Sequence, residues 1–341
     1  MYIPGITRFF EMPVKAVLWI LLVVVACGAM AYAALELSPW PSALVYRWWM
    51  DHGGIEMNQA LEEQVPPSIG ARLDQSYDED DADALLDVYF PESATKALPT
   101  IVWVHGGGFL AGDRRQVGNY VRILAGRGYT TVAVGYSLAP ASHYPTPLLQ
   151  VNAALAYLVR HAEQLQIDPA RLFLAGDSAG AQIAAQLATI ISSPEYAKAV
   201  GIVPSIRREQ LRGVILHCGI YDLGLAKFDG AYGHFMRTIV WSYSGVKEFG
   251  EKARLPEFSV PRHVTGDFPP AFISVGNADA LLPHSRVLAD ALVKRGVKVD
   301  TLFFPEDYRP ALPHEYQFHL DTGAGREALE RTVRFLKATA Y

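Results

Sequence analysis

The sequence predicts an α/β fold, in which helices cover both faces of a mostly parallel β-sheet. Short apolar runs of strand type alternate with helical segments along most of the chain, as in proteins with parallel sheets. Half of the 341 residues are hydrophobic, so the chain can bury a large core. One apolar run ends in the motif G-x-S-x-G at residues 176–180 and passes directly into a helical segment. Together these features predict one α/β domain over residues 69–341.

The elements of this domain follow from hydrophobic periodicity. Strands are expected at residues 84–90, 100–104, 130–134, 172–175, 213–218, 271–275 and 299–304. Helices are expected at residues 118–127, 145–166, 182–188, 285–295 and 325–338. The acidic run at residues 74–83 predicts a solvated hairpin turn. Residues 223–262 interrupt the alternation and are rich in aromatic side chains, which indicates a cap inserted over a site.

The N-terminal part of the chain has a different composition. Residues 16–35 carry no charge and are numerous enough to cross the hydrocarbon layer as a helix. Arg8 and Lys15 lie in the short segment 1–15 before it, which favours a cytoplasmic N-terminus. We therefore expect an uncleaved, single-pass transmembrane signal anchor with the α/β domain outside the cytoplasm.

Three alternatives stay open for the apolar segment. Residues 31–33 read A-Y-A, which resembles a signal-peptidase site and would make the segment a cleaved signal peptide. Residues 24–27 loosely resemble a lipobox that ends in Cys27, which would give a lipid anchor. A buried core helix is the third alternative, although no polar face occurs at helical spacing.

Residues 36–68 connect the apolar segment to the α/β domain, and we expect cap helices there. The sequence S-P-W-P at residues 38–41 interrupts the apolar segment, and an aromatic run of helical type follows. Trp40, Trp48 and Trp49 suit a membrane interface, where amphipathic rings prefer to lie. They equally suit a position over a substrate pocket, and the sequence does not separate the two interpretations.

Charge and cysteine content exclude several classes of function. The net charge is −5 without basic blocks, so nucleic-acid binding is not expected. Cys27 and Cys218 lie far apart, so no disulfide is expected. The pair H-E at residues 314–315 suggests the zinc motif H-E-x-x-H, but His319 comes one position too late to share a helix face. We therefore expect neither a metal nor a cofactor.

Ser178 is the candidate nucleophile. A strand that turns abruptly into a helix around a serine forms a nucleophile elbow, which exposes the hydroxyl above the sheet. Gly176 and Gly180 supply the small neighbours that this turn requires, and the N–H group of Ala179 would face a developing oxyanion. A tight turn that contains a serine by chance is the alternative.

The motif H-G-G-G at residues 105–108 follows directly on an expected strand. A glycine run at this place lets backbone N–H groups approach the negative oxygen that forms during acyl transfer. A flexible turn and a phosphate cradle are the alternatives. Neither glycine pattern of a phosphate cradle follows, so we favour the oxyanion interpretation.

A serine nucleophile needs a base that a carboxylate orients. In this architecture the acid and then the base follow the serine along the chain. Asp279 comes just after the strand at 271–275, where sites of open α/β sheets gather, and is the expected acid. His314 lies in a loop after the last strand and is the expected base. Asp222 and Asp267 are the weaker choices for the acid, and His319 is the weaker choice for the base. We expect His217 to be a structural histidine of a core strand and His143 to be a loop residue.

Together these residues resemble the hormone-sensitive-lipase-like family of α/β-hydrolases. The resemblance covers about residues 70–341 and rests on 105–108, Y-S-L-A-P at 136–140, G-D-S-A-G at 176–180, Asp279 and His314. It implies an α/β-hydrolase fold with Ser178 as nucleophile, Asp279 as acid and His314 as base. It also implies an oxyanion hole made by the N–H groups of Gly107, Gly108 and Ala179. The chain departs from the usual family pattern at Ser137, at residues 280–284, and at Glu315, where the family usually has glycine.

The resemblance implies a serine carboxylic-ester hydrolase, of esterase or lipase type, that forms an acyl-enzyme and needs no cofactor. The apolar segment at residues 16–35 adds the expected membrane anchor. The aromatic cap favours a small ester with an apolar acyl or alcohol group of short to medium length. A deacetylase of envelope glycans or small acetylated compounds is an alternative. A non-catalytic binding protein and a membrane scaffold with this fold are two more, and the first of these predicts loss of a site residue.

Overall fold

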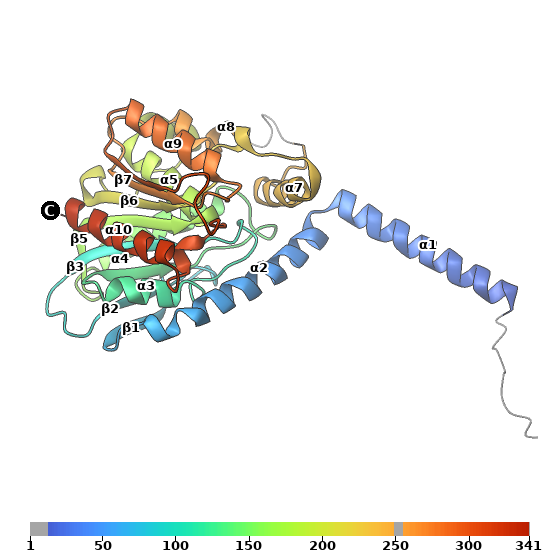
Figure 1. Cartoon of the computed structure of the whole chain (residues 1–341), viewed down its shortest axis with the longest axis horizontal. Coiled ribbons are helices and arrows are strands. Elements are labelled where there is room, and N and C mark those ends of the chain that lie inside the picture. The colour runs from blue at the N-terminus through green and yellow to red at the C-terminus, as the bar shows by residue number, and fades with distance from the viewer. Residues whose placement is uncertain (1–12, 249–254, 341) are drawn as a thin grey trace, which may run out of the picture.

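An eight-stranded sheet runs through the centre of the molecule (Figure 1). The computed structural model describes residues 13–248 and 255–340. The strands are β1 (Ile69–Ser76), β2 (Leu85–Pro91), β3 (Leu98–Val104), β4 (Thr130–Val134), β5 (Ile167–Asp177), β6 (Leu211–His217), β7 (Ala271–Val275) and β8 (Val299–Phe303). Their order is β1-β2-β4-β3-β5-β6-β7-β8. β2 is antiparallel to β1 and β4, and every pair from β4 to β8 is parallel, which confirms the predicted sheet.

Ten helices are defined within the described residues. They are α1 (Val14–Leu37), α2 (Trp40–Ala60), α3 (Gly118–Ala125), α4 (Thr146–Arg160), α5 (Ser178–Ser192), α6 (Pro194–Val200), α7 (Gly230–Ser244), α8 (Leu255–Phe258), α9 (Leu282–Lys294) and α10 (Gly323–Thr339). Single 3₁₀ turns include η1 (Glu62–Gln64), η2 (Arg208–Gln210), η3 (Leu223–Leu225), η5 (Val260–Arg262) and η6 (Tyr316–Phe318).

Alternation along the central strands divides the core into two layers. Val102 and Val104 of β3 pack in one apolar cluster with residues of α4, α5 and α9. Ile101 and Trp103 point to the opposite face and pack in a second cluster with α3 and α10. Because successive side chains of a strand point to opposite faces, both faces of this sheet need helical cover. The expected helices on both faces are confirmed.

The expected elements differ from the structure mainly at the edge of the sheet. The predicted helix at 145–166 ends at Arg160, because Ile167 already pairs with Leu98 in the sheet. Strand β1 was not predicted, and the acidic run is more than a solvated turn. Asp74 lies in β1 and accepts hydrogen bonds from Arg114 and Arg115, so only the exposed tip of this hairpin fits the expectation.

Helix α1 projects away from the body of the molecule (Figure 1). It has 24 residues and a mean hydropathy of 2.4, and none of its residues is buried. The alternative of a buried core helix is therefore wrong, and the length and composition suit a membrane span or a signal sequence. Arg8, which the predicted orientation uses, lies outside the described residues.

Helices α2 and α7 pack against each other beside the carboxyl ends of the strands. The ring of Tyr46 on α2 contacts the ring of Phe235 on α7 edge to face, with centroids 4.9 Å apart. The expected cap at 223–262 contains η3, α7, α8 and η5, and its residues 249–254, including Phe249, lie outside the described residues. The cap is therefore formed jointly by α2 and this insertion.

Candidate active site

Ser178 lies at the turn from β5 into α5. Its φ angle of 52° is in the left-handed region, which costs a non-glycine residue about 1–3 kcal/mol. A Cβ atom on Gly176 would lie 2.6 Å from the carbonyl carbon of Gly180, and one on Gly180 would lie 2.0 Å from the carbonyl oxygen of Val104. Both positions therefore exclude a side chain, and they let the start of α5 rest directly on β3.

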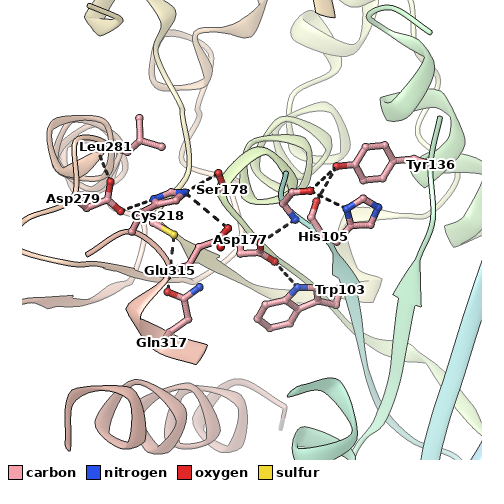
Figure 2. Close-up of polar contacts among 12 residues, drawn as sticks. Trp103, His105, Tyr136, Asp177, Ser178, Cys218, Asp279, Leu281, Glu315 and Gln317 are labelled. Atoms are coloured by element: carbon pink, nitrogen blue, oxygen red, sulfur yellow. Dashed lines mark hydrogen bonds and ion pairs between the residues drawn. The ribbon is translucent and has the colours of Figure 1, made fainter. Parts of the chain in front are cut away.

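The imidazole of His314 lies between Ser178 and Asp279 (Figure 2). Its Nε2 atom is 3.0 Å from Ser178 Oγ, and its Nδ1 atom is 2.7 Å from Asp279 Oδ2. The other carboxylate oxygen of Asp279 accepts a hydrogen bond of 2.8 Å from the N–H group of Leu281. The structure thus brings together Ser178 and Asp279, which follow β5 and β7, and His314 from the loop between β8 and η6.

The weaker choices make other contacts, although His319 lines the same cavity as Ser178. Asp222 Oδ1 accepts a hydrogen bond from the N–H group of Gly224 at the start of η3, and Asp267 lies in an exposed loop. His217 is buried with its Nδ1 atom 2.7 Å from Ser274 Oγ, and His143 contacts the Ser242 carbonyl oxygen from a loop. His319 is exposed just after η6.

The surroundings of His314 favour its protonated form. Partial removal from water disfavours the imidazolium, but the neighbouring Cys218 and Asp279 side chains outweigh this and hold the pKa of His314 well above its ordinary value. Burial raises the pKa of the Cys218 thiol to about 11. A neutral imidazole in this position can accept a proton from Ser178, and Asp279 stabilises the imidazolium that results.

The loop after β3 presents free backbone N–H groups beside Ser178. Gly107 and Gly108 have φ angles of 104° and 59°, and a Cβ atom on Gly107 would lie 2.1 Å from the Ala111 carbonyl oxygen. In the part of the chain that the structure describes, the N–H groups of Gly107 and Gly108 donate no hydrogen bond. The N–H group of Ala179 belongs to the first turn of α5, where helices leave such donors unpaired. All three residues line the same cavity as Ser178.

The residues that hold this loop in place were not predicted from the sequence. Asp177 is buried, and its two carboxylate oxygens accept hydrogen bonds of 2.8 Å from Trp103 Nε1 and from the N–H group of Gly106 (Figure 2). The Tyr136 hydroxyl donates a hydrogen bond of 2.8 Å to the His105 carbonyl oxygen. Asp177 and Tyr136 belong to motifs that the sequence displayed, but their partners come from a different strand.

Glu315 is a second acidic residue at the site that the sequence analysis did not assign. It has a φ angle of 59°, which explains why glycine is usual at this position. Its Oε1 atom lies 3.8 Å from His314 Nε2. Burial and then the nearby Glu315 carboxyl group hold the pKa of Asp177 well above its ordinary value.

Helix α2 is bonded to the same loops. The Arg47 guanidinium donates hydrogen bonds to the carbonyl oxygens of Leu110 and Ala139. Asp51 Oδ1 accepts a hydrogen bond of 2.9 Å from the N–H group of Gly112. The helix that we expected only as a cap therefore also supports the backbone around the glycine run.

A cavity of about 1500 Å³ leads from Ser178 to the surface between α2 and α7. Its inner end is lined by Ser178, His314 and the glycine run, and its outer part by Trp48, Trp49 and Tyr232, among others. This volume exceeds the usual range of about 300–1,000 Å³ for small-ligand pockets. The site can therefore hold an ester with a large apolar group.

One cluster at the site has a spacing that can hold a metal ion. The Cys218 thiol, an Asp279 oxygen and a His314 nitrogen lie within 4.8 Å of one another. The imidazole and the carboxylate of this cluster are hydrogen-bonded to each other. Cys27 and Cys218 are both free, as expected.

Residues 101–312 match a protein family described as having the alpha/beta hydrolase fold. The acetyl esterases of Salmonella choleraesuis (strain SC-B67) and Salmonella paratyphi B (strain ATCC BAA-1250 / SPB7) are each 28% identical over 217 residues, which is 62% of this chain. The match spans 64% of the length of these relatives, less than two thirds.

Solved structures agree with the fold. Esterase B from Lactobacillus rhamnosis (HN001) aligns with a TM-score of 0.78 at 24% identity, over 90% of this chain and 96% of that chain. An esterase from Pyrobaculum calidifontis aligns with a TM-score of 0.70 at 20% identity, over 87% of this chain and 93% of that chain. At this level of identity the likeness establishes the shared architecture.

Proposed function

Because this chain belongs to the alpha/beta hydrolase family that matches residues 101–312, we propose that it is a serine carboxylic-ester hydrolase. One observation carries the proposal: a single imidazole, His314, lies within hydrogen-bonding distance of both Ser178 Oγ and Asp279 Oδ2. A non-catalytic protein with this fold would not need all three groups in contact. The acetyl esterase relatives support the same class of reaction.

In the proposed reaction, His314 Nε2 accepts the Ser178 proton as Ser178 Oγ attacks the ester carbonyl carbon. The tetrahedral intermediate collapses to an acyl-enzyme, and the imidazolium gives its proton to the departing alcohol. Water then attacks the acyl carbon while His314 takes a proton from it, and Ser178 leaves with that proton. Asp279 orients the imidazole and stabilises its charge during both steps.

The negative oxygen of each tetrahedral intermediate would lie against the N–H groups of Gly107, Gly108 and Ala179. Such preorganised donors commonly contribute about 10²–10³ in rate each. The contacts of Asp177 with Gly106 and of Tyr136 with His105 keep the glycine run fixed, so the donors need not reorganise during the reaction.

The substrate that fits best is a small ester with one large apolar group, because the cavity is large and its outer part is aromatic. A deacetylase of acetylated glycans or small compounds is the second candidate, since both named relatives are acetyl esterases. The two differ in acyl preference. A series of 4-nitrophenyl esters of increasing acyl length separates them, because a deacetylase would accept acetate and reject longer chains.

We also propose that α1 is a single-pass anchor that holds the catalytic domain outside the cytoplasm. Its length, its hydropathy and its lack of buried residues support this proposal, as do Arg8 and Lys15 before it. Protease added to intact cells should digest the catalytic domain, and the chain should keep its N-terminal segment. Protection of the domain would contradict the orientation, and loss of the segment would indicate a cleaved signal peptide.

Labelling with a fluorophosphonate tests the reaction directly. The wild-type chain should be labelled and should hydrolyse 4-nitrophenyl acetate, and Ser178→Ala should do neither. His314→Ala should also lose activity, whereas the matched variant His319→Ala should keep most of it. A folded wild-type chain without labelling, or an active His314→Ala variant, would contradict the proposal.

A further inference from the structure

Helix α2 directs polar side chains toward the protein. Arg47 donates to the Ala139 carbonyl oxygen, and Asp51 accepts from Gly112. Further along the same face, the Asn58 side chain accepts a hydrogen bond of 2.8 Å from the N–H group of Asn119. The buried face of this helix is therefore fixed by hydrogen bonds to the loops around the active site.

The opposite face of α2 is apolar and uncovered. Leu44, Val45, Trp48 and Trp49 have exposed fractions of 52%, 65%, 64% and 64%, and we call these four residues the apolar stripe. Residues four apart lie one above the other on a helix, so Leu44 joins Trp48 and Val45 joins Trp49 in one patch. This arrangement is the reverse of a normal surface helix, and contiguous exposed patches of this kind mark contact with a partner or a membrane.

The stripe continues directly into α1. Only Ser38 and Pro39 separate the end of α1 at Leu37 from the start of α2 at Trp40. Lys247, which follows α7, donates hydrogen bonds to the carbonyl oxygen and the carboxylate of Glu36, the latter at 2.7 Å. The junction is therefore tied to the cap, and a membrane that holds α1 would lie next to the stripe.

The mouth of the active-site cavity is at the same place. Trp48 and Trp49 are exposed, and they also line the cavity that reaches Ser178. Tyr232 and Phe235 of α7 line the cavity as well, and Phe235 contacts Tyr46 of α2. Both positions that the sequence left open for the tryptophans, over a pocket and at an interface, are thus compatible with one geometry.

From these observations we propose that the apolar stripe rests in the surface of a lipid bilayer and that the substrate is an ester amphiphile that enters the cavity from that bilayer. The proposal rests on the proposed ester hydrolysis. Continuity with α1 favours a bilayer over a second copy of the chain as the partner of the stripe. Since the chain carries no basic blocks that would attract anionic lipids, we expect the stripe to bind a bilayer of neutral lipids through its apolar side chains.

Activity of the full chain in phosphatidylcholine vesicles tests the route of entry. The ratio of kcat/KM for 4-nitrophenyl dodecanoate, which partitions into the vesicles, to kcat/KM for water-soluble 4-nitrophenyl acetate is measured. Leu44→Gln/Val45→Gln should lower this ratio at least about fivefold, because neither residue lines the cavity but both contact the bilayer. The matched control Leu149→Gln/Val293→Gln changes exposed residues of α4 and α9 and should leave the ratio unchanged. Equal ratios in the two double variants would overturn the proposal.

Quenching by brominated phosphatidylcholine gives a readout independent of activity. In a Trp19→Phe/Trp40→Phe background, which removes the tryptophan of α1 and the exposed one at its junction with α2, brominated vesicles should quench the fluorescence, and Trp48→Phe/Trp49→Phe should remove most of the quenching. If Trp48→Phe/Trp49→Phe left the quenching unchanged, the apolar stripe would not be in contact with the bilayer. If the apolar stripe instead covers a second copy of the chain, brominated vesicles would not quench Trp48 and Trp49. In that case Leu44→Gln/Val45→Gln would change the mass of the detergent-solubilised protein, and this outcome would also overturn the proposal. If 4-nitrophenyl acetate is not hydrolysed at all, the proposed function fails, whereas the quenching still tests docking.

Discussion

Helices α5 and α1 use similar apolar residues in opposite surroundings. All 15 residues of α5 are buried, because the helix packs against β3, β5 and β6 in the centre of the fold. None of the 24 residues of α1 is buried. Hydrophobic side chains therefore require cover from water, but their composition does not say which partner provides it. Where the chain itself provides none, as along α1 and the apolar stripe of α2, a partner outside the chain has to provide the cover.

The two regions also differ in their tolerance of change. At the start of α5, close backbone contacts hold Gly176 and Gly180, and hydrogen bonds hold Asp177 and Ser178. Along α1 no side chain contacts the core. Substitutions near α5 should therefore have large effects on activity or stability, and substitutions along α1 and at its junction should have small effects.

The largest expected effect is the loss of activity when the proposed acid, Asp279, is changed. Asp279→Asn should lower kcat/KM by about 10³–10⁴-fold, because an amide stabilises the wrong imidazole tautomer. Since the Asp279 carboxylate contributes to the raised pKa of His314, and the base must be neutral, the acidic limb of the pH profile should move to lower pH in the variant. The profile of kcat/KM measures both effects. Asp267→Asn, in an exposed loop, is the matched control, and an equal loss there would contradict the assignment.

The next largest effect is expected from alanine substitution of a glycine in α5, compared with the same change in α1. A Cβ atom on Gly180 would lie 2.0 Å from the Val104 carbonyl oxygen, whereas one on Gly28 in α1 would meet nothing within 4 Å. Gly180→Ala should destabilise the chain by about 3 kcal/mol or more, because α5 cannot stay on β3. Gly28→Ala should cause no loss of stability. Thermal unfolding of the detergent-solubilised full chain measures both effects. Similar unfolding midpoints for the two variants would contradict the expectation that α5 tolerates less change than α1.

Acid should destabilise the sheet through buried histidines. Burial lowers the pKa of His217 from 6.5 to about 3, and that of His284 to about 4. The unfolded chain binds these protons below about pH 6.5 and the folded chain does not, so the contribution of these two histidines to stability is full above pH 6.5 and falls toward pH 4. Each histidine should contribute a slope of up to about 1.4 kcal/mol per pH unit. Urea unfolding at several pH values measures this slope.

A matched pair of variants assigns that slope. His217→Leu should reduce the dependence of the unfolding free energy on pH, because the buried proton-binding group is gone. His319→Leu removes an exposed histidine and should leave the dependence unchanged. An identical slope in both variants would show that the buried imidazole is not its source.

The smallest effect is expected at the junction of α1 with the cap. The Glu36–Lys247 pair is about half exposed, and such pairs contribute little to stability and weaken in salt. Lys247→Gln should leave the unfolding midpoint unchanged in high salt and nearly unchanged in low salt. A large shift in the midpoint would mean that this junction, contrary to the comparison, is part of the stable core.

Strands buried on both faces could be predicted from the sequence, and so could β8 at one edge of the sheet, whereas β1 at the other edge could not. β4 and β7 have the predicted bounds, because strands buried on both faces are continuous apolar runs. β1 was missed because none of its residues is fully buried at the edge of the sheet, where the apolar pattern is weak. Residues 74–83 appeared only as an acidic run, although Asp74 is held in β1 by two arginines.

The sequence by itself determined the local features of this protein: the alternation of strands and helices, the glycine-flanked serine, the glycine run and the apolar N-terminal helix. Each of these follows from the periodicity or from the backbone requirements of a few neighbouring residues. Only the tertiary structure decided that Asp177 supports the Gly106 loop, that Glu315 lies near Asp177 and that the apolar side of α2 faces outward. The physical reason is that these features depend on contacts between segments far apart in the sequence, which the local spacing of residues does not predict.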